Sequence, residues 1–114
     1  MTKRAEFLRV KQTGRAKAGR FVVVSTLEDA SLGHLTTGFI TTRRIGKAHD
    51  RNRVRRRLRE VVRAHAPAFA DLRRYLVTIA RPGAAQADFA QLEADWLKQA
   101  RRLGLIPRSG EPQP

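Results

Sequence analysis

Cysteine is absent from this 114-residue chain, which excludes disulfides, thiol catalysis and the usual cysteine-based zinc sites. Long apolar runs are absent too: no stretch reaches the length of about 18 residues that a membrane-spanning helix needs. The first residues, MTKRAEFLRVK, lack the apolar segment of roughly 7–15 residues that is typical of a signal peptide. We therefore expect a cytoplasmic protein in a reducing compartment, with no membrane partner.

Acidic residues are scarce, with 10 Asp and Glu against 24 Lys and Arg and a formal net charge of +14. This excess is far larger than solubility requires, and it indicates a polyanionic partner, with nucleic acid favoured over an anionic membrane. Asp88, Glu93 and Asp95 have the spacing of surface charges near a helix start, and His49 and His65 are better explained as packing or rim residues. We expect no catalytic residue, and no metal or cofactor bound by the protein alone.

The length and the 41% hydrophobic content fit one folded domain, which we place at residues 1–106. Three prolines in residues 107–114 predict a disordered C-terminal tail. Apolar periodicity and turn residues predict the order α-β-β-α-β-α in a single α+β domain, with the first strands open to subdivision. The expected helices are Thr2–Thr13, Ala48–His65 and Gln86–Leu103; the expected strands are Arg20–Leu27 and His34–Thr42, paired as an antiparallel hairpin, and Tyr75–Ala80.

The basic residues gather in one place, because ten of them lie between Arg43 and Arg63, where Asp50 and Glu60 are the only acids. On a helical wheel, an apolar stripe through this segment is suited to packing on a sheet. The stripe consists of Val54, Leu58, Val61, Val62 and His65. One glutamate cannot neutralise seven arginines on the same helix, so a polyanion is needed to make the arrangement favourable.

Two residues near the start of this helix have expected roles. Gly46 allows a tight strand-to-helix connection, and we expect it to be a residue that needs positive φ. Asp50 is a candidate N-cap or partner of the helix dipole, and the free backbone amides of the first turn are suited to phosphate.

The run TRRIGKAHDRNRVRRRLR, residues 42–59, resembles the signature of the protein subunit of bacterial ribonuclease P. The resemblance continues at Phe7, Gly14, Phe21 and Gly38 and covers roughly residues 3–103. The positions in register with the signature are Thr42, Arg43, Arg44, Ile45, Gly46, Ala48, Arg51, Asn52, Arg53, Val54, Arg55, Arg56 and Arg59.

The resemblance implies an α/β sandwich, a small mixed sheet with packed helices, whose strand–helix–strand unit crosses over with a left hand. General rules alone predict a right hand. It also implies an accessory subunit of the tRNA 5′-maturation endoribonuclease, which binds a catalytic RNA and precursor tRNA and supports removal of the 5′ leader. The chemistry is then expected in the RNA subunit, with Mg²⁺ in the RNA–protein holoenzyme. No obligate protein partner is evident.

The same resemblance implies two binding surfaces. One is a cleft between the first helix and the sheet that grips the single-stranded leader, with Phe7, Lys11 and Phe21 as candidates; Phe21 is also readable as a core residue, and Lys11 stands where some members carry an aromatic. The other surface contacts the RNA subunit, through phosphates and, at Asn52, a sugar, a base edge or a local cap. Its candidates are Arg43, Arg44, Lys47, Arg51, Asn52, Arg53, Arg55, Arg56 and Arg59.

Four alternatives remain. A ribosomal-type structural RNA-binding protein would share the charge, size and fold class, but it would not need G-x-A-x-x-R-N-R at a strand-to-helix junction. In a zipper-type DNA-binding helix the apolar heptads would have to continue past Pro67. A membrane-surface helix would need bulkier apolar residues opposite the arginines. An autonomous nuclease would cleave precursor tRNA without any RNA subunit.

Overall fold

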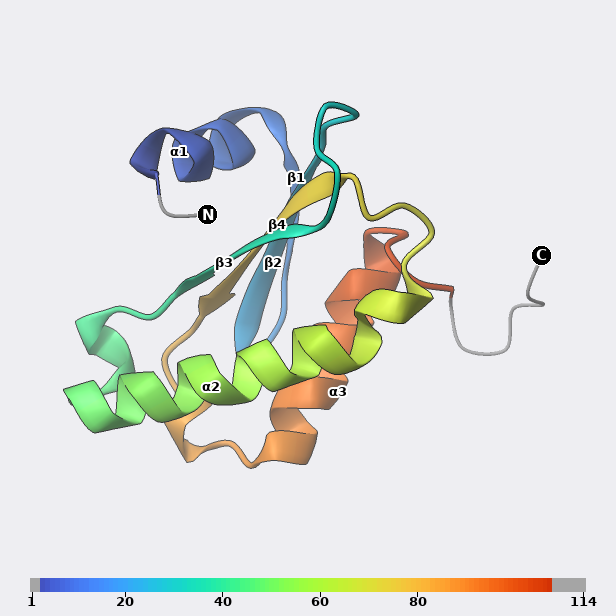
Figure 1. Ribbon diagram of the computed structural model, residues 1–114. Helices are drawn as coiled ribbons and strands as arrows, with labels where there is room; N and C mark the ends of the chain where they lie inside the picture. Colours follow the sequence, from blue (N-terminus) through green and yellow to red (C-terminus); the bar gives the residue numbers. More distant parts are fainter. Residues whose placement is uncertain (1–2, 108–114) are drawn as a thin grey trace.

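The computed structural model describes residues 3–107. Pro107 is therefore the only described residue of the predicted tail; residues 108–114 lie outside the described part, as does Thr2 of the first predicted helix. Among residues 3–107, no helix is both long and apolar enough to cross a membrane. The elements, shown in Figure 1, are α1 (Arg4–Thr13), β1 (Arg15–Ala18), β2 (Val22–Glu28), β3 (Thr36–Ile40), η1 (Arg43–Ile45), α2 (Ala48–His65), η2 (Ala66–Ala68), β4 (Arg74–Ala80), η3 (Ala84–Gln86) and α3 (Phe89–Arg102).

The four strands form one mixed sheet in the order β1-β2-β4-β3. The predicted antiparallel hairpin between β2 and β3 is wrong, because β4 lies between these two strands, antiparallel to β2 and parallel to β3. The pairing of β2 with β4 runs over seven residue pairs, from Val22–Ala80 to Glu28–Arg74, whereas the shorter β3 offers five. The apolar β4 thus gains a neighbour on each edge, and the threonine-rich β3 takes the outside position.

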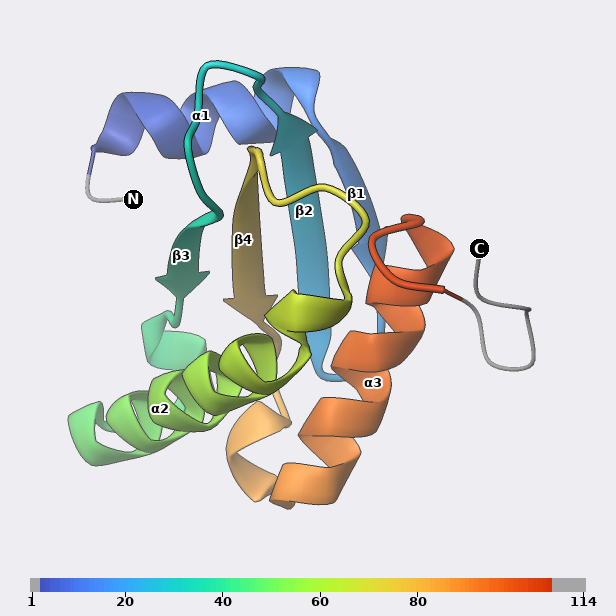
Figure 2. The same ribbon diagram turned by 45° about the vertical axis from the view of Figure 1, so that its right-hand side comes forward.

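The connection from β3 through α2 to β4 has a left hand. Figure 2 shows α2 in front of the sheet, β3 and β4 both pointing down, and β4 to the right of β3. A right-handed connection would place β4 on the other side of β3 when the helix faces the viewer. The hand implied by the family resemblance is therefore confirmed, and the general rule fails for this unit.

Helices cover both faces of the sheet (Figures 1 and 2). On one face α2 and α3 bury the larger core, which includes Leu58, Leu92 and Trp96, all fully buried. The Trp96 indole donates a hydrogen bond of 3.2 Å to Thr78 Oγ1 on β4. On the other face α1 packs over a smaller cluster, centred on Val10 and Tyr75. The α/β sandwich expected from the sequence is thus present.

The third helix begins later than predicted because Asp88 caps it. The Asp88 carboxylate accepts from Gln91 N at 2.8 Å, and the Gln91 side chain accepts from Asp88 N at 3.0 Å. Further along the helix, Asp95 is not the surface charge that its sequence position predicts. Its carboxylate accepts from the backbone amides of Phe21 and Val22, at 2.8 and 3.1 Å, and so ties α3 to the start of β2.

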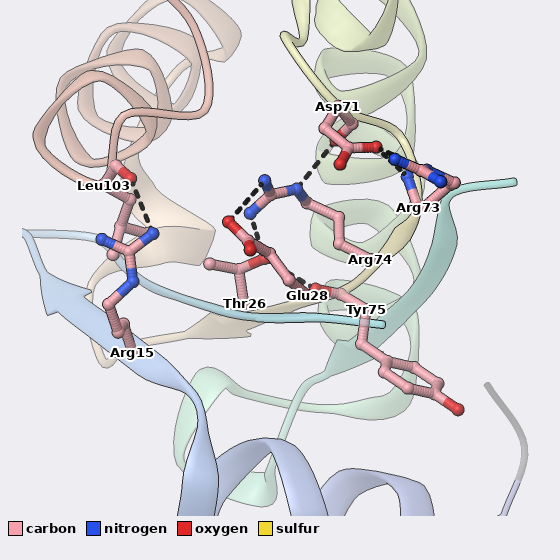
Figure 3. Close-up of polar contacts among 8 residues, drawn as sticks. All are labelled: Arg15, Thr26, Glu28, Asp71, Arg73, Arg74, Tyr75 and Leu103. Atoms are coloured by element: carbon pink, nitrogen blue, oxygen red, sulfur yellow. Dashed lines mark hydrogen bonds and ion pairs between the residues drawn. The ribbon is translucent and has the colours of Figure 1, made fainter. Parts of the chain in front are cut away.

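Strand β1 is absent from the sequence prediction, because the four residues RAKA carry no apolar alternation. Pairing with β2 holds it in place, and the Arg15 guanidinium donates to Leu103 O at 3.2 Å. Near it, Arg74 extends β4 one residue earlier than predicted although it is only 5% exposed. Figure 3 shows the Arg74 guanidinium between Asp71 O, Thr26 Oγ1 and Glu28, which satisfy a buried charge.

Candidate nucleic-acid interface

The turn between β3 and α2 has the backbone that the sequence predicts. Gly46 has φ of 143°, a region that disfavours side chains, and a Cβ there would lie 2.8 Å from Asp50 Oδ2. Asp50 is not the N-cap, since Lys47 occupies that position without a side-chain cap. Asp50 instead lies in the first turn, where its Oδ1 is 3.2 Å from His49 Nε2 and 3.3 Å from Arg53 Nη2. Its negative charge therefore complements the helix dipole.

The predicted apolar stripe fixes how α2 lies. Val54, Leu58, Val61 and Val62 are buried against the core. His65 is half-buried, stacks on Trp96 with ring centroids 6.2 Å apart, and has its Nε2 3.0 Å from Glu93 Oε2. The other positions of α2, which include its seven arginines, lie outside this stripe.

Three arginines of α2 are used inside the protein. The guanidiniums of Arg53 and Arg57 donate to Ala85 O and Ala87 O, each at 3.1 Å, and so join α2 to the segment around η3. Arg55 donates to Thr41 Oγ1 at 2.6 Å and to Asn52 Oδ1 at 3.1 Å. These contacts hold the helix to its neighbours, and each guanidinium remains positively charged.

A second group of cations has no such contacts. Within residues 3–107, no hydrogen bond or ion pair engages the side chains of five predicted RNA-binding residues, and four of these residues are exposed while Arg51 is half-buried. They are Arg43, Arg44, Lys47, Arg51 and Arg56. Arg59 is exposed as well, and its guanidinium lies 5.8 Å from the centroid of the Phe39 ring. We call these five free cations together with Arg59 the α2 surface. Each of the five can meet a phosphate without breaking an internal contact.

The second predicted site is a cleft of about 490 Å³ between α1 and the sheet. Phe7 and Lys11 line it, as predicted. Phe21 does not: it packs against the core on the opposite face of the sheet, and the Arg20 guanidinium lies 5.0 Å from its ring centroid. Alternation along β2 places Val23 in the cleft and Val22 in the core on the α2 side. Phe21 does not follow this alternation, because it lies in a bend just before β2 and its backbone amide is held by the Asp95 carboxylate on α3.

Sequence reasoning missed several residues of this cleft. Arg4 lines it from α1, and Ile40 and Ile79 form its floor. Arg4 was detectable, because it precedes Phe7 by three residues and Lys11 by seven, the spacing of one helical face. Floor residues of a sheet became assignable only once the strand order was known.

A brace outside the cleft holds α1 in position. The Arg9 guanidinium lies 3.0 Å from Asp29 Oδ2 in the β2–β3 loop. Hydrogen bonds from the Ser31 hydroxyl and amide, and then from Arg9, lower the pKa of Asp29. Asp29 is therefore charged at neutral pH, and the pair connects the helix to the loop.

The part of the chain that the structure describes contains no group of three His, Cys, Asp or Glu residues able to hold a metal ion. Its prominent side chains at both surfaces are arginines, lysines and one phenylalanine. Such side chains bind phosphates and stack on bases. A sandwich with unpaired arginines at one edge and an open basic cleft under α1 thus defines a class: small α/β proteins with surfaces suited to a polyanion.

Comparison with known proteins identifies the family within this class. The profile of the family Ribonuclease P matches residues 1–104. The chain is 39% identical over 102 residues to the Ribonuclease P protein component of Chloroflexus aggregans, covering 90% of this chain and 75% of that one. It is 40% identical over 94 residues to the protein component of Thermus thermophilus, covering 82% of this chain and 53% of that one. The chain belongs to the Ribonuclease P family.

Solved structures support the same fold. The RNase P protein of Staphylococcus aureus superposes with a TM-score of 0.85 at 24% identity, over 93% of this chain and 95% of that one. An RNase P protein from Thermotoga maritima superposes with a TM-score of 0.75 at 22% identity, over 96% and 97%. The sandwich is thus shared with these proteins at low identity.

Proposed function

We propose that this chain is the protein component of ribonuclease P, the endoribonuclease that removes the 5′ leader of precursor tRNA. The family membership and the relatives named as protein components support this function. Its partners are then the catalytic RNA subunit and precursor tRNA. The observation that carries the proposal is the set of free cations on the α2 surface, in register with the family signature and held by Gly46 and the buried stripe.

The α2 surface is the proposed contact with the RNA subunit. Arg43, Arg44, Lys47, Arg51 and Arg56 bind phosphates through charge-assisted hydrogen bonds. Arg55 and Arg59 add charge next to them, and Asn52 is exposed at the helix start. Arg53 acts by holding the helix to Ala85 O, so that the free arginines share one orientation.

The cleft under α1 is the proposed site for the leader. Its apolar floor and the Phe7 ring suit bases, which stack on aromatic side chains without sequence preference. Arg4 and Lys11 at its rim suit the phosphates of the same strand. A single-stranded leader fits this combination better than a duplex, whose bases are already stacked on one another.

The chemistry in this proposal belongs to the RNA subunit, with Mg²⁺ in the holoenzyme. The protein side chains at both surfaces bind and orient RNA, and an arginine stays charged at neutral pH and does not act as a general base. The protein thus contributes affinity and position. We expect the protein to increase cleavage by strengthening substrate binding and by stabilising the fold of the RNA subunit.

Reconstitution tests this division of roles. Precursor tRNA is incubated with the purified chain, with a ribonuclease P RNA, and with both. We expect no cleavage by the chain alone and faster leader removal by the pair than by the RNA. Cleavage by the chain after exhaustive nuclease treatment of the preparation would contradict the proposal and favour an autonomous nuclease.

A second experiment addresses the ribosomal alternative. RNA that copurifies with the chain from cells is sequenced. One abundant structured RNA of the ribonuclease P type is the expected result. Recovery of ribosomal RNA alone would support the structural RNA-binding protein instead.

A further inference from the structure

Helix α1 is attached to the rest of the protein by few contacts. Of its residues Arg4–Thr13, only Val10 is buried, and the N-cap residue Lys3 makes no side-chain cap hydrogen bond. The other end is held more closely, because a Cβ at Gly14 would clash with Thr26 O on β2. The position of the rest of α1 over the sheet therefore depends on a small number of side-chain contacts.

The position of α1 matters because one wall of the cleft is a face of this helix. The sheet supplies the opposite wall, so a shift of α1 changes the distance between the Phe7 ring and the sheet. A binding site keeps its affinity only while its walls stay in the geometry that fits the ligand. The residues that line the cleft from α1 include Arg4, Phe7, Leu8 and Lys11.

Arg9 is the residue through which α1 reaches the β2–β3 loop. Its Nη1 donates a hydrogen bond of 3.0 Å to Asp29 Oδ2, and its guanidinium lies 5.8 Å from the centroid of the Tyr75 ring. Arg9 does not line the cleft, since it follows Phe7 by two residues and so points to the other side of the helix. Its contacts thus hold α1 from outside the cleft.

Asp29 is a firmly held partner for this arginine. Its backbone amide donates to Arg73 O at 3.0 Å, and its carbonyl accepts from Leu32 N at 3.0 Å. Its Oδ1 accepts from the Ser31 hydroxyl at 2.6 Å and from the Ser31 amide at 3.0 Å. The Asp29 side chain is only 14% exposed, whereas that of Arg9 is 53% exposed. The carboxylate is therefore already oriented when Arg9 meets it, which lowers the entropy cost of the pair.

We infer that the Arg9–Asp29 brace positions α1 over the cleft and thereby sets the affinity for the leader. Both are positioning residues, because neither touches the leader in this arrangement. The inference rests on the proposed function and extends it to two residues outside the cleft and outside the family signature. Without the brace α1 takes up more positions, and the affinity falls in proportion to the fraction of molecules whose cleft is competent.

Two substitutions separate the brace from a general effect of charge. Arg9→Ala lowers the net charge by one unit, and Asp29→Asn raises it by one unit. Attraction of RNA to total charge predicts opposite effects on affinity, weaker for the first variant and stronger for the second. Loss of the brace predicts that both variants bind the leader more weakly. Asp29→Asn also keeps an oxygen that accepts from Ser31, so the turn of the loop is retained.

The chain offers a matched control at the same end of the sheet. Arg73 Nε lies 3.3 Å from Asp71 Oδ1, which also accepts from Arg73 N at 2.9 Å, and no residue of α1 takes part. Arg73→Ala and Asp71→Asn therefore change the charge in the same way and break an ion pair that does not hold α1. The main-chain oxygen of Arg73 that accepts from Asp29 N remains in both.

The experiment uses the full chain reconstituted with a ribonuclease P RNA. Affinities for precursor tRNA and for mature tRNA are titrated for each variant, and thermal melting verifies the fold. We expect Arg9→Ala and Asp29→Asn each to weaken precursor binding by about three- to fivefold, the most that an exposed ion pair contributes. The double variant should lose no more than either single variant, because both remove the same contact. Mature tRNA should bind as before, and the two controls should leave the ratio of the two affinities unchanged.

Three outcomes overturn the inference. In the first, Asp29→Asn binds precursor tRNA as tightly as wild type or more tightly, so that charge or a direct contact of Arg9 explains the loss in Arg9→Ala. In the second, the losses add in the double variant, so that the two residues act separately. In the third, the melting temperature falls while the ratio of affinities is unchanged. Failure of the proposed function looks different, because the wild-type complex would then bind precursor and mature tRNA equally.

Discussion

The α2 surface and the cleft under α1 are both basic, but they hold their charge differently. On the α2 surface, five cations without internal partners follow one another within fourteen residues, 43–56. In the cleft, Arg4 and Lys11 lie at the rim of a largely apolar space floored by Ile40 and Ile79. The first surface is suited to phosphates alone, and the second to bases together with phosphates. The two should therefore respond differently to salt, to truncation of arginines and to loss of an aromatic ring.

The largest effect is expected from Arg51→Ala combined with Arg56→Ala. Each lost phosphate contact should cost about 1–3 kcal/mol of affinity for the RNA subunit, and thermal stability should change little because neither side chain has an internal partner among the described residues. Filter binding and thermal melting measure the two quantities. Arg73→Ala combined with Arg102→Ala removes the same charge elsewhere and serves as the control. Equal losses from both pairs would show that position on α2 is unimportant.

The cleft should be affected by loss of its aromatic ring. Phe7→Leu retains an apolar side chain and removes the stacking surface, so precursor tRNA should bind more weakly by about 1–3 kcal/mol per stacked base. Affinity for the RNA subunit should not change. Mature tRNA is the control substrate, since it has no leader. If precursor and mature tRNA lost affinity equally, the cleft would not be the leader site.

Arg53 should behave differently from Arg56 although both belong to the R-N-R-x-R-R run. Arg53→Ala breaks the hydrogen bond to Ala85 O and the ion pair with Asp50, and we expect a loss of about 1–2 kcal/mol in the free energy of unfolding. Arg56→Ala should change it by less than about 0.5 kcal/mol. Urea denaturation measures both. Similar stabilities for the two variants would mean that Arg53 does not brace the helix.

The smallest effect is expected at Gly46. Val at φ of 143° is strained, and its Cβ would lie 2.8 Å from Asp50 Oδ2, so Gly46→Val should destabilise the protein by about 1 kcal/mol or more and disturb the α2 surface. Gly33→Val is the control, because a Cβ there meets no atom within 4 Å. Unchanged melting temperature and RNA affinity in Gly46→Val would show that the positive φ of Gly46 does not require glycine.

Much of this arrangement was predictable from local patterns. Ala48–His65 was predicted with its bounds, because the apolar stripe and the arginines between its members have a clear helical period. Gly46 was predicted from its position between a strand and that helix. The R-N-R motif then located the α2 surface, since its residues are close together in the chain.

What the sequence did not predict depends on contacts between distant segments. The position of β4 between β2 and β3 follows from the competition of all strands for neighbours, which no single strand's pattern reveals. The displacement of Phe21 from the cleft follows from the bend that precedes β2 and from the Asp95 carboxylate, which accepts from the amides of Phe21 and Val22. The internal use of Arg53 also required the structure, because its acceptor, Ala85 O, lies 32 residues away.

The salt dependence of RNA-subunit binding tests the central claim most directly. If the free cations of the α2 surface each meet a phosphate, the logarithm of affinity should fall with the logarithm of salt concentration by several units, at about 0.7–0.9 per contact. Arg56→Ala should lower that slope by about one contact, and Arg73→Ala should leave it unchanged. Equal changes in slope and affinity from these two variants would contradict the account, because total charge rather than the α2 surface would then bind the RNA.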